Sequence, residues 1–275
     1  MQIVKTPASA HAVAANLARP LGLVPTMGAL HAGHLRLLER ARAENASVAA
    51  SLFVNPLQFG RGEDFERYPR GFERDVAQFD AAGVDVLYAP AVEAMYPPGF
   101  ATSIEVGTVG ERFEGAARPG HFTGVATVVA KLLHALEPTR LYLGQKDVQQ
   151  TAVLRHLVRD LDMPVELVVV PTVREDDGLA RSSRNAYLTP EQRAAAPSLH
   201  RALEAVAEAI GRDPDASKAV ASARALLQPP LEWDYLEVVD ADTFEPLTEC
   251  RPPAYVVGAA RAGPTRLIDN VAVAA

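Results

Sequence analysis

The strongest constraint on the fold is an alternation of short apolar runs with helix-like segments over the first 170 residues. The apolar runs predict buried strands at residues 2–4, 21–24, 47–54, 84–88, 140–143 and 165–170. Between them, composition and periodicity predict helices at residues 8–17, 35–44, 72–82, 124–136 and 148–160. Nearly continuous apolar strands separated by helices are typical of a parallel sheet covered on both faces. The sequence therefore predicts an α/β fold with a doubly wound parallel sheet, whose ligands bind at the carboxyl ends of the strands.

The pattern changes after Pro171. Residues 189–210 and 216–227 are predicted to be helical, and Pro190 suits a first helical turn. Strand-like segments then follow one another without intervening helices, at residues 235–239, 254–259 and 265–270. Consecutive strands favour an antiparallel sheet. We therefore expect a first domain of residues 1–172 and a smaller C-terminal α+β domain of residues 173–275.

Composition narrows the class of protein. The net charge of −7 argues against a nucleic-acid partner, and the single cysteine, Cys250, excludes a disulfide framework or a cysteine-based zinc site. The first residues lack the charged and apolar regions of a signal peptide, and no apolar run is long enough to span a membrane. We therefore expect a cytoplasmic protein. Two long connections, residues 55–70 and about 91–122, carry aromatic residues and are expected to be ordered loops.

Two histidines lie at the join of a predicted strand and a predicted helix, in the stretch LVPTMGALHAGH (residues 23–34). If the helix begins near Ala32, His31 and His34 both project from its first turn. The N-terminus of a helix attracts anions, and Gly33 would let a phosphate approach the backbone. Two histidines of no functional role are the alternative, whereas a metal site lacks a third ligand nearby. The strand and helix around the pair favour phosphate binding.

Four more polar clusters occur in the motifs FVNPLQFG, RPGHFTG, LGQKDVQQ and GLARSSRNAYL. Lys146 suits a phosphate, Asp147 a ribose hydroxyl, and the amides of Asn55 and Gln58 suit hydroxyls or a carboxylate. Each cluster alone is also explained by turn or capping chemistry. Four of the five clusters, however, follow a strand or open a helix, where an open α/β sheet binds its ligand. Together they predict a nucleotide site, although the common P-loop, dinucleotide, zinc-protease and hydrolase signatures are all lacking.

In this order, the motifs PTMGALHAGH, FVNPLQFG, RPGHFTGVATVVAKL, YLGQKDVQQ and GLARSSRNAYL resemble those of the pantothenate synthetase (pantoate–β-alanine ligase) family, a branch of the HxGH nucleotidylyltransferase superfamily. The resemblance implies a homodimer with a Rossmann-like nucleotide-binding domain and a C-terminal lid domain. It also implies that (R)-pantoate reacts with ATP to give pantoyl adenylate and pyrophosphate. The amine of β-alanine then displaces AMP to give pantothenate. Magnesium is expected to arrive with ATP, without a metal site of the protein's own.

The resemblance also implies roles for individual residues. His34, His31, Lys146 and Arg184 would be catalytic, with Lys146 on the phosphates and Asp147 on the ribose. Gln58 and Gln150 would bind the hydroxyls of pantoate, and Gln58 would also contact β-alanine. The full ATP set would be Met27, Gly28, Ala29, Leu30, His31, Ala32, Gly33, His34, Gly144, Gln145, Lys146, Asp147, Val173, Arg181, Ser182, Ser183 and Arg184.

Two positions depart from the family pattern. Arg181 replaces a methionine, so its side chain would either add a cation near the phosphates or turn to solvent. Arg74-Asp75 replaces two adjacent carboxylates, which argues against a metal role there. The alternatives are another HxGH nucleotidylyltransferase, which would need a second phosphate site, and a nucleotide-binding protein without turnover, which would lack His34, Lys146 or Arg184.

Overall fold

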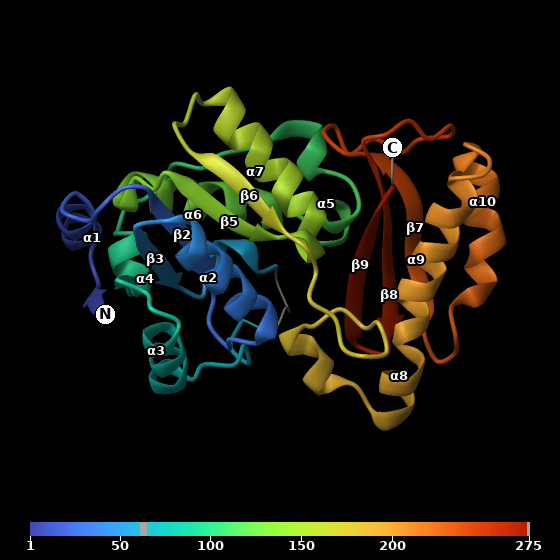
Figure 1. The fold of residues 1–275 in the computed structure, drawn as a ribbon, viewed down its shortest axis with the longest axis horizontal. Coiled ribbons are helices and arrows are strands. Elements are labelled where there is room, and N and C mark those ends of the chain that lie inside the picture. The colour runs from blue at the N-terminus through green and yellow to red at the C-terminus, as the bar shows by residue number, and fades with distance from the viewer. Residues whose placement is uncertain (61–64, 274–275) are drawn as a thin grey trace. The chain divides into compact units, whose positions relative to one another are not determined.

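The computed structural model describes residues 1–60 and 65–273, which form two compact units (Figure 1). The first unit comprises Met1–Gly144 and Val153–Val170, and the second comprises Gln145–Ala152 and Pro171–Ala275. The second unit thus takes in a segment that the sequence placed in its first domain. The domain boundary between residues 172 and 173 stays a prediction. Residues 61–64 of the long connection 55–70 lie outside the described residues.

In its described part, the first unit contains one six-stranded parallel sheet in the order β1-β4-β3-β2-β5-β6. The strands are β1 (Gln2–Val4), β2 (Leu21–Thr26), β3 (Ser47–Leu52), β4 (Val86–Tyr88), β5 (Arg140–Gly144) and β6 (Glu166–Val170). The order reverses between β2 and β5, since the chain leaves β2 toward β3 and leaves β5 toward β6. Such a switch point opens a crevice at the carboxyl ends of the two strands, which is where open α/β sheets bind ligands.

Helices cover both faces of this sheet. The helices are α1 (Pro7–Ala14), α2 (Ala32–Glu44), α3 (Phe72–Ala81), α4 (Val92–Met95), α5 (Glu114–Ala117), α6 (His121–Leu136) and α7 (Val148–Asp160). Leu38 of α2 and Phe79 of α3 are fully buried against strand residues that include Val24 and Leu87. Leu23, which points to the other face because side chains alternate along a strand, is also fully buried. The predicted doubly wound parallel sheet is therefore confirmed.

The second unit has an antiparallel sheet in the order β7-β8-β9. Its strands are β7 (Glu232–Asp240), β8 (Ala254–Ala262) and β9 (Thr265–Val273), and its helices are α8 (Pro190–Ala195), α9 (Pro197–Ile210) and α10 (Ala216–Ala223). Leu203 and Val206 of α9 pack with Leu236 and Val256 of the sheet in one apolar core. The predicted α+β architecture of the C-terminal part is confirmed.

Element boundaries differ from expectation in a few places. The prediction of a single helix over residues 189–210 is wrong, because the chain forms two helices, α8 and α9, which meet at Ala196 and Pro197. Pro197 lacks the N–H that would continue α8, and its fixed φ suits the first turn of a new helix. The helix expected to reach residue 227 ends at Ala223 and continues as a short 3₁₀ turn. None of the described helices is long and apolar enough to cross a membrane.

Candidate active site

The two histidines lie where the chain enters α2. His31 is the N-cap residue, and its Nδ1 accepts a hydrogen bond from the Gly33 N–H at 3.1 Å. His34 Nδ1 in turn accepts from the His31 N–H at 3.4 Å, and the two ring centroids are 4.1 Å apart. Because each Nδ1 accepts, the neutral rings carry their protons on Nε2, and Nε2 is the donor that each imidazole can present. A Cβ at residue 33 would lie only 2.8 Å from His31 Cε1, so glycine keeps this pair in place.

Asp75 holds the loop that precedes the histidines. Gly28 and Ala29 have φ values of 86° and 52°, a left-handed conformation that is unusual for alanine. The carboxylate of Asp75 accepts hydrogen bonds from the Ala29 N–H at 2.9 Å and the Leu30 N–H at 3.0 Å. Asp75 lies on α3 and is 2% exposed, so a buried carboxylate holds the backbone of this loop. Asp75 is therefore a positioning residue. Among the described residues, no group of three or more His, Cys, Asp or Glu side chains is placed to hold a metal ion.

Asn55 is occupied by internal contacts and supports Gln58. Its Nδ2 donates to Gln58 Oε1 and to the carbonyl of Gly124, both at 3.1 Å. Its Oδ1 accepts from the Leu57 N–H at 3.3 Å and from the Tyr96 hydroxyl at 2.8 Å. These four bonds use the full capacity of an amide side chain, and Asn55 is 1% exposed. Asn55 is thus not placed to contact a substrate hydroxyl, although the sequence suggested that use; it orients Gln58 instead.

The RPGHFTG motif holds the backbone of the same short segment. His121 Nδ1 donates to the Gln58 carbonyl at 2.8 Å, and an Arg118 Nη2 donates to the same oxygen at 3.2 Å. Gly124 lets α6 approach closely, since a Cβ there would lie 2.3 Å from the Leu57 carbonyl oxygen. The RPGHFTG motif therefore positions Gln58 by binding the Gln58 backbone. This is more than the loop and helix cap that would explain the motif without a functional role.

The Tyr96 hydroxyl donates one of the four hydrogen bonds of Asn55. Burial raises the pKa of this hydroxyl above the ordinary value, so the group remains a donor to Asn55 at all physiological pH values. The ammonium of Lys131 lies 5.9 Å from the Tyr96 ring centroid and 5.0 Å from that of Phe100, within reach of a cation–π interaction. Nothing in the sequence pointed to Tyr96.

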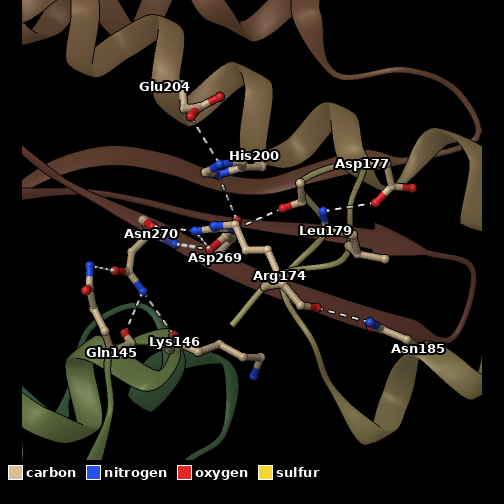
Figure 2. Close-up of polar contacts among 12 residues, drawn as sticks. Gln145, Lys146, Arg174, Asp177, Leu179, Asn185, His200, Glu204, Asp269 and Asn270 are labelled. Atoms are coloured by element: carbon tan, nitrogen blue, oxygen red, sulfur yellow. Dashed lines mark hydrogen bonds and ion pairs between the residues drawn. The ribbon is translucent and has the colours of Figure 1, made fainter. Parts of the chain in front are cut away.

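In the second unit, the Gln145–Asp147 segment forms a 3₁₀ turn directly after β5. Lys146 Nζ lies 3.4 Å from Asp147 Oδ1, so the two side chains that the resemblance assigns to phosphate and ribose are neighbours. The backbone of this turn is bound by Asn270 of β9, which donates to the carbonyls of Gln145 and Lys146 at 2.8 and 3.0 Å (Figure 2). Gln150 follows on the first turn of α7 and is half-buried.

Residues 173–181 form a hairpin that leads into the Ser182–Arg184 segment. The Arg181 N–H donates to the Val173 carbonyl at 2.9 Å, and Arg174 pairs with Ala180 across the hairpin. Arg181 Nη2 lies 2.9 Å from Glu175 Oε2. Glu175 therefore balances its charge, while the Arg181 side chain is 38% exposed. The two options that the sequence left for Arg181, a cation near the phosphates or a side chain in solvent, stay predictions.

The hairpin and the residues next to it include polar side-chain atoms without a hydrogen-bond partner. Ser182 Oγ caps a 3₁₀ turn by accepting from the Arg184 N–H at 3.2 Å, and Asn185 Nδ2 donates to the Ala180 carbonyl at 3.0 Å. In the part of the chain that the structure describes, three buried side-chain atoms between residues 172 and 185 have no hydrogen-bond partner: Thr172 Oγ1, Arg181 Nε and Asn185 Oδ1. Buried polar atoms are normally satisfied in folded proteins, so these three atoms are exceptions within this segment.

The predicted residues thus fall into three groups. In the first unit, one group is the His31–His34 pair with its loop from Met27, and another is Gln58 with the side chains that hold it. In the second unit, Asn270 and Arg174 connect the Lys146 turn with the hairpin that begins at Val173. Sequence reasoning missed the roles of the supporting residues, because each acts through a partner far along the chain: Asp75, Tyr96, Arg174, Asp269 and Asn270.

Comparison with known proteins identifies the family of this chain. Residues 2–272 match the family model described as Pantoate-beta-alanine ligase. A pantothenate synthetase from Rhizorhabdus wittichii is 55% identical over 92% of this chain and 91% of its own length. A relative of the same name from Thermus thermophilus is 54% identical over 92% of this chain and 93% of its own.

Solved structures give the same result. The pantothenate synthetase of Thermus thermophilus superposes with a TM-score of 0.94 and 52% identity, covering 100% of both chains. A pantoate-beta-alanine ligase from Francisella tularensis, solved in complex with beta-gamma ATP and beta-alanine, has a TM-score of 0.80 and 33% identity over 99% of this chain and 97% of its own. The sequence match over nearly every residue and the shared fold together show that the chain belongs to the pantoate–β-alanine ligase family.

Proposed function

We propose that this enzyme condenses (R)-pantoate with β-alanine at the expense of ATP, through a pantoyl-adenylate intermediate, and releases AMP and pyrophosphate. The observation that carries the proposal is the His31–His34 pair at the N-terminus of α2, beside the switch point of the sheet. Backbone N–H groups, the helix dipole and two imidazole Nε2 donors converge there, and all of them favour phosphate. We propose that Mg²⁺ enters as part of the ATP substrate.

In the first step, a carboxylate oxygen of pantoate attacks the α-phosphorus. A new P–O bond forms, the bond to the bridging oxygen of the β-phosphate breaks, and pyrophosphate leaves with the electron pair. Negative charge grows on the phosphoryl oxygens and on the leaving group, and prepositioned donors stabilise it most effectively. We assign that role to His34, Lys146 and Arg184, with His31 assisting at the phosphates.

In the second step, the neutral amine of β-alanine attacks the acyl carbon of the adenylate. The C–N bond forms, the C–O bond to AMP breaks, and the amine loses a proton to solvent or buffer. No nucleophilic side chain takes part. Because only the unprotonated amine attacks, the rate of this step rises with pH until β-alanine is fully deprotonated.

Gln58 and Gln150 are proposed to bind the hydroxyls of pantoate, and Gln58 also to contact β-alanine. Neutral amides suit hydroxyl groups, since they offer both donors and acceptors without a charge to desolvate. The support for Gln58 is its placement: its Oε1 accepts from Asn55, so the Nε2 donors are turned toward other partners. We further propose that the enzyme is a cytoplasmic homodimer, as the family resemblance implies.

The test supplies purified enzyme with ATP, Mg²⁺, (R)-pantoate and β-alanine, and measures AMP. AMP release is expected only when both organic substrates are present. Pyrophosphate exchange into ATP is expected with pantoate alone, since the adenylate forms before β-alanine reacts. AMP release without pantoate, or exchange that depends on β-alanine, would contradict the proposed order of steps.

A further inference from the structure

Two adjacent residues in the middle of strand β9, Asp269 and Asn270, contact the Gln145–Asp147 turn and the 173–181 hairpin of the second unit. Asn270 is 1% exposed, and its side chain makes three hydrogen bonds to one turn (Figure 2). Its Nδ2 donates to the carbonyls of Gln145 and Lys146 at 2.8 and 3.0 Å, and its Oδ1 accepts from Gln145 Nε2 at 3.2 Å. Three hydrogen bonds from a single buried side chain fix the backbone from which Lys146 projects.

Asp269 binds the other segment, the 173–181 hairpin, through Arg174. Its carboxylate accepts two hydrogen bonds from the guanidinium of Arg174, at 2.6 and 3.0 Å, in the bidentate geometry that gives strong and directional pairs. Arg174 also donates to the carbonyl of Gly178 at 3.1 Å and to that of Asn270 at 3.3 Å. The base and the turn of the 173–181 hairpin are thus both tied to β9.

The Asp269 carboxylate has a second neighbouring side chain, His200 of α9. His200 Nδ1 lies 3.2 Å from Asp269 Oδ2, and His200 Nε2 lies 3.2 Å from Glu204 Oε1, with His200 and Glu204 both on α9 (Figure 2). Asp269 Oδ1 also accepts from the Asn270 N–H at 2.8 Å. Asp269 therefore lies between Arg174 and a residue of α9, the helix that packs in the apolar core of the second unit.

We infer that Asn270 and Asp269 are positioning residues for ATP: Asn270 sets the place of Lys146, and Asp269 sets that of the hairpin leading to Arg184. Neither residue is proposed to touch the nucleotide. The inference rests on the proposed assignment of Lys146 and Arg184 to the phosphates of ATP.

The experiment compares three variants of the full-length enzyme. Asn270→Ala removes the three hydrogen bonds, and Asn270→Asp keeps the shape but sets a carboxylate oxygen against two carbonyl oxygens. Asp240→Ala is the matched control: in the same unit, it also removes three hydrogen bonds, those that Asp240 Oδ1 accepts from Asp242 and Thr243. The readouts are the KM for ATP, the KM for pantoate, kcat, and the rise in melting temperature caused by MgATP without other substrates.

Both Asn270 variants are expected to lose on the order of 10- to 100-fold in kcat/KM for ATP, the range seen when supporting residues are removed. The KM for pantoate should stay within about twofold. The stabilisation by MgATP should shrink with the lost affinity. Asp240→Ala should lower the melting temperature while keeping wild-type kinetics for ATP.

Two results would overturn the inference: Asn270→Asp with wild-type kcat/KM for ATP, or equal losses for ATP and pantoate in all three variants. Lys146→Ala separates this from a failure of the proposed site. If Lys146→Ala keeps wild-type activity, the assignment of Lys146 is wrong. If it is impaired while both Asn270 variants are normal, only the positioning inference is wrong.

Discussion

At the residue scale, this protein separates groups that would meet substrates from groups that hold them in place. Asn55 and Gln58 show the difference, since they are close in sequence and chemically alike. Asn55 has every donor and acceptor occupied by the protein, whereas Gln58 receives one of those bonds and is held by its carbonyl from His121 and Arg118. A saturated, buried amide cannot also bind a ligand without losing a bond, so its role is to orient its neighbour.

The first prediction concerns the proposed catalytic donors. His34→Ala and Lys146→Ala should each lower turnover by a factor on the order of 10²–10³, the usual loss for one donor aimed at transition-state charge. Pantoate-dependent ATP–pyrophosphate exchange measures the first step directly. Exchange near the wild-type rate in either variant would contradict the role assigned to that residue. Lys218→Ala, an exposed lysine paired with Asp213, is the control for removing a cation.

The second prediction concerns Asp75. Asp75→Asn keeps the volume but replaces one acceptor oxygen with an N–H₂ group that faces a backbone N–H. The left-handed turn at Ala29 should loosen, and kcat should fall on the order of 10- to 100-fold, because small misplacements of reacting groups are costly. Asp80→Asn makes the same chemical change on the exposed side of the same helix, α3. Steady-state kinetics should separate the two, and equal activity of both variants would show that Asp75 does not position the loop.

At the element scale, strands and helices could be predicted where a local pattern sufficed. The amphipathic pattern predicts a helix over residues 35–44, and the structure extends it by one turn to begin at Ala32. The break at Pro197 was missed, since the apolar pattern runs on through α8 and α9 without a gap. Asn270 could not be found as a positioning residue, because its contact with Lys146 joins residues 124 apart and leaves no local trace in the sequence.

The third prediction tests the close approach of α6 to the Gln58 segment. A Cβ at residue 124 would lie 2.3 Å from the Leu57 carbonyl oxygen and 2.7 Å from the Gln58 nitrogen, both backbone atoms that cannot turn aside. Gly124→Ala should therefore cost roughly 1–3 kcal/mol in stability by overpacking and raise the KM for pantoate.

Gly211→Ala is the control for that prediction. Gly211 has an ordinary helical φ of −61°, and its nearest neighbours would be 3.5 and 3.7 Å from a Cβ. Gly211→Ala should stabilise the protein by about 0.5 kcal/mol or leave its stability unchanged, because alanine lowers the conformational entropy of the unfolded chain. Urea denaturation and substrate kinetics check both variants. A wild-type KM for pantoate in Gly124→Ala would show that the packing of α6 against the Gln58 segment does not affect pantoate binding.

At the scale of the whole molecule, the chain offers a way to follow its two units separately. Trp233, the single tryptophan, lies on β7 of the second unit, and its indole N–H donates to the Arg224 carbonyl at 2.9 Å. Tryptophan fluorescence therefore reports the antiparallel unit, whereas far-UV circular dichroism reports both units. Non-coincident transitions would show that the two units unfold separately.

The same probe tests the acid stability that Asp269 confers on the second unit. Burial raises the pKa of its carboxyl, but the neighbouring His200 ring and the hydrogen-bonded Arg174 guanidinium outweigh that effect and hold the folded pKa below the ordinary value. A lowered folded pKa means that the stabilisation is complete above the unfolded pKa of about 3.9 and is lost as the pH falls through the folded pKa. Asp269→Asn should cost about 2 kcal/mol at pH 7 and much less at pH 3.

Urea midpoints of Trp233 fluorescence between pH 3 and 7 measure the difference between the wild type and Asp269→Asn. Every other ionisable side chain of the unit is present in both proteins, so the difference reports the loss of the Asp269 carboxylate and of its contacts with Arg174 and His200. Asp213→Asn serves as the control, because its exposed pair with Lys218 is weakened by solvent and should shift the midpoint little at any pH. A difference between wild type and Asp269→Asn that stays constant from pH 7 to pH 3 would show that the ionised carboxylate is not what stabilises this part of β9.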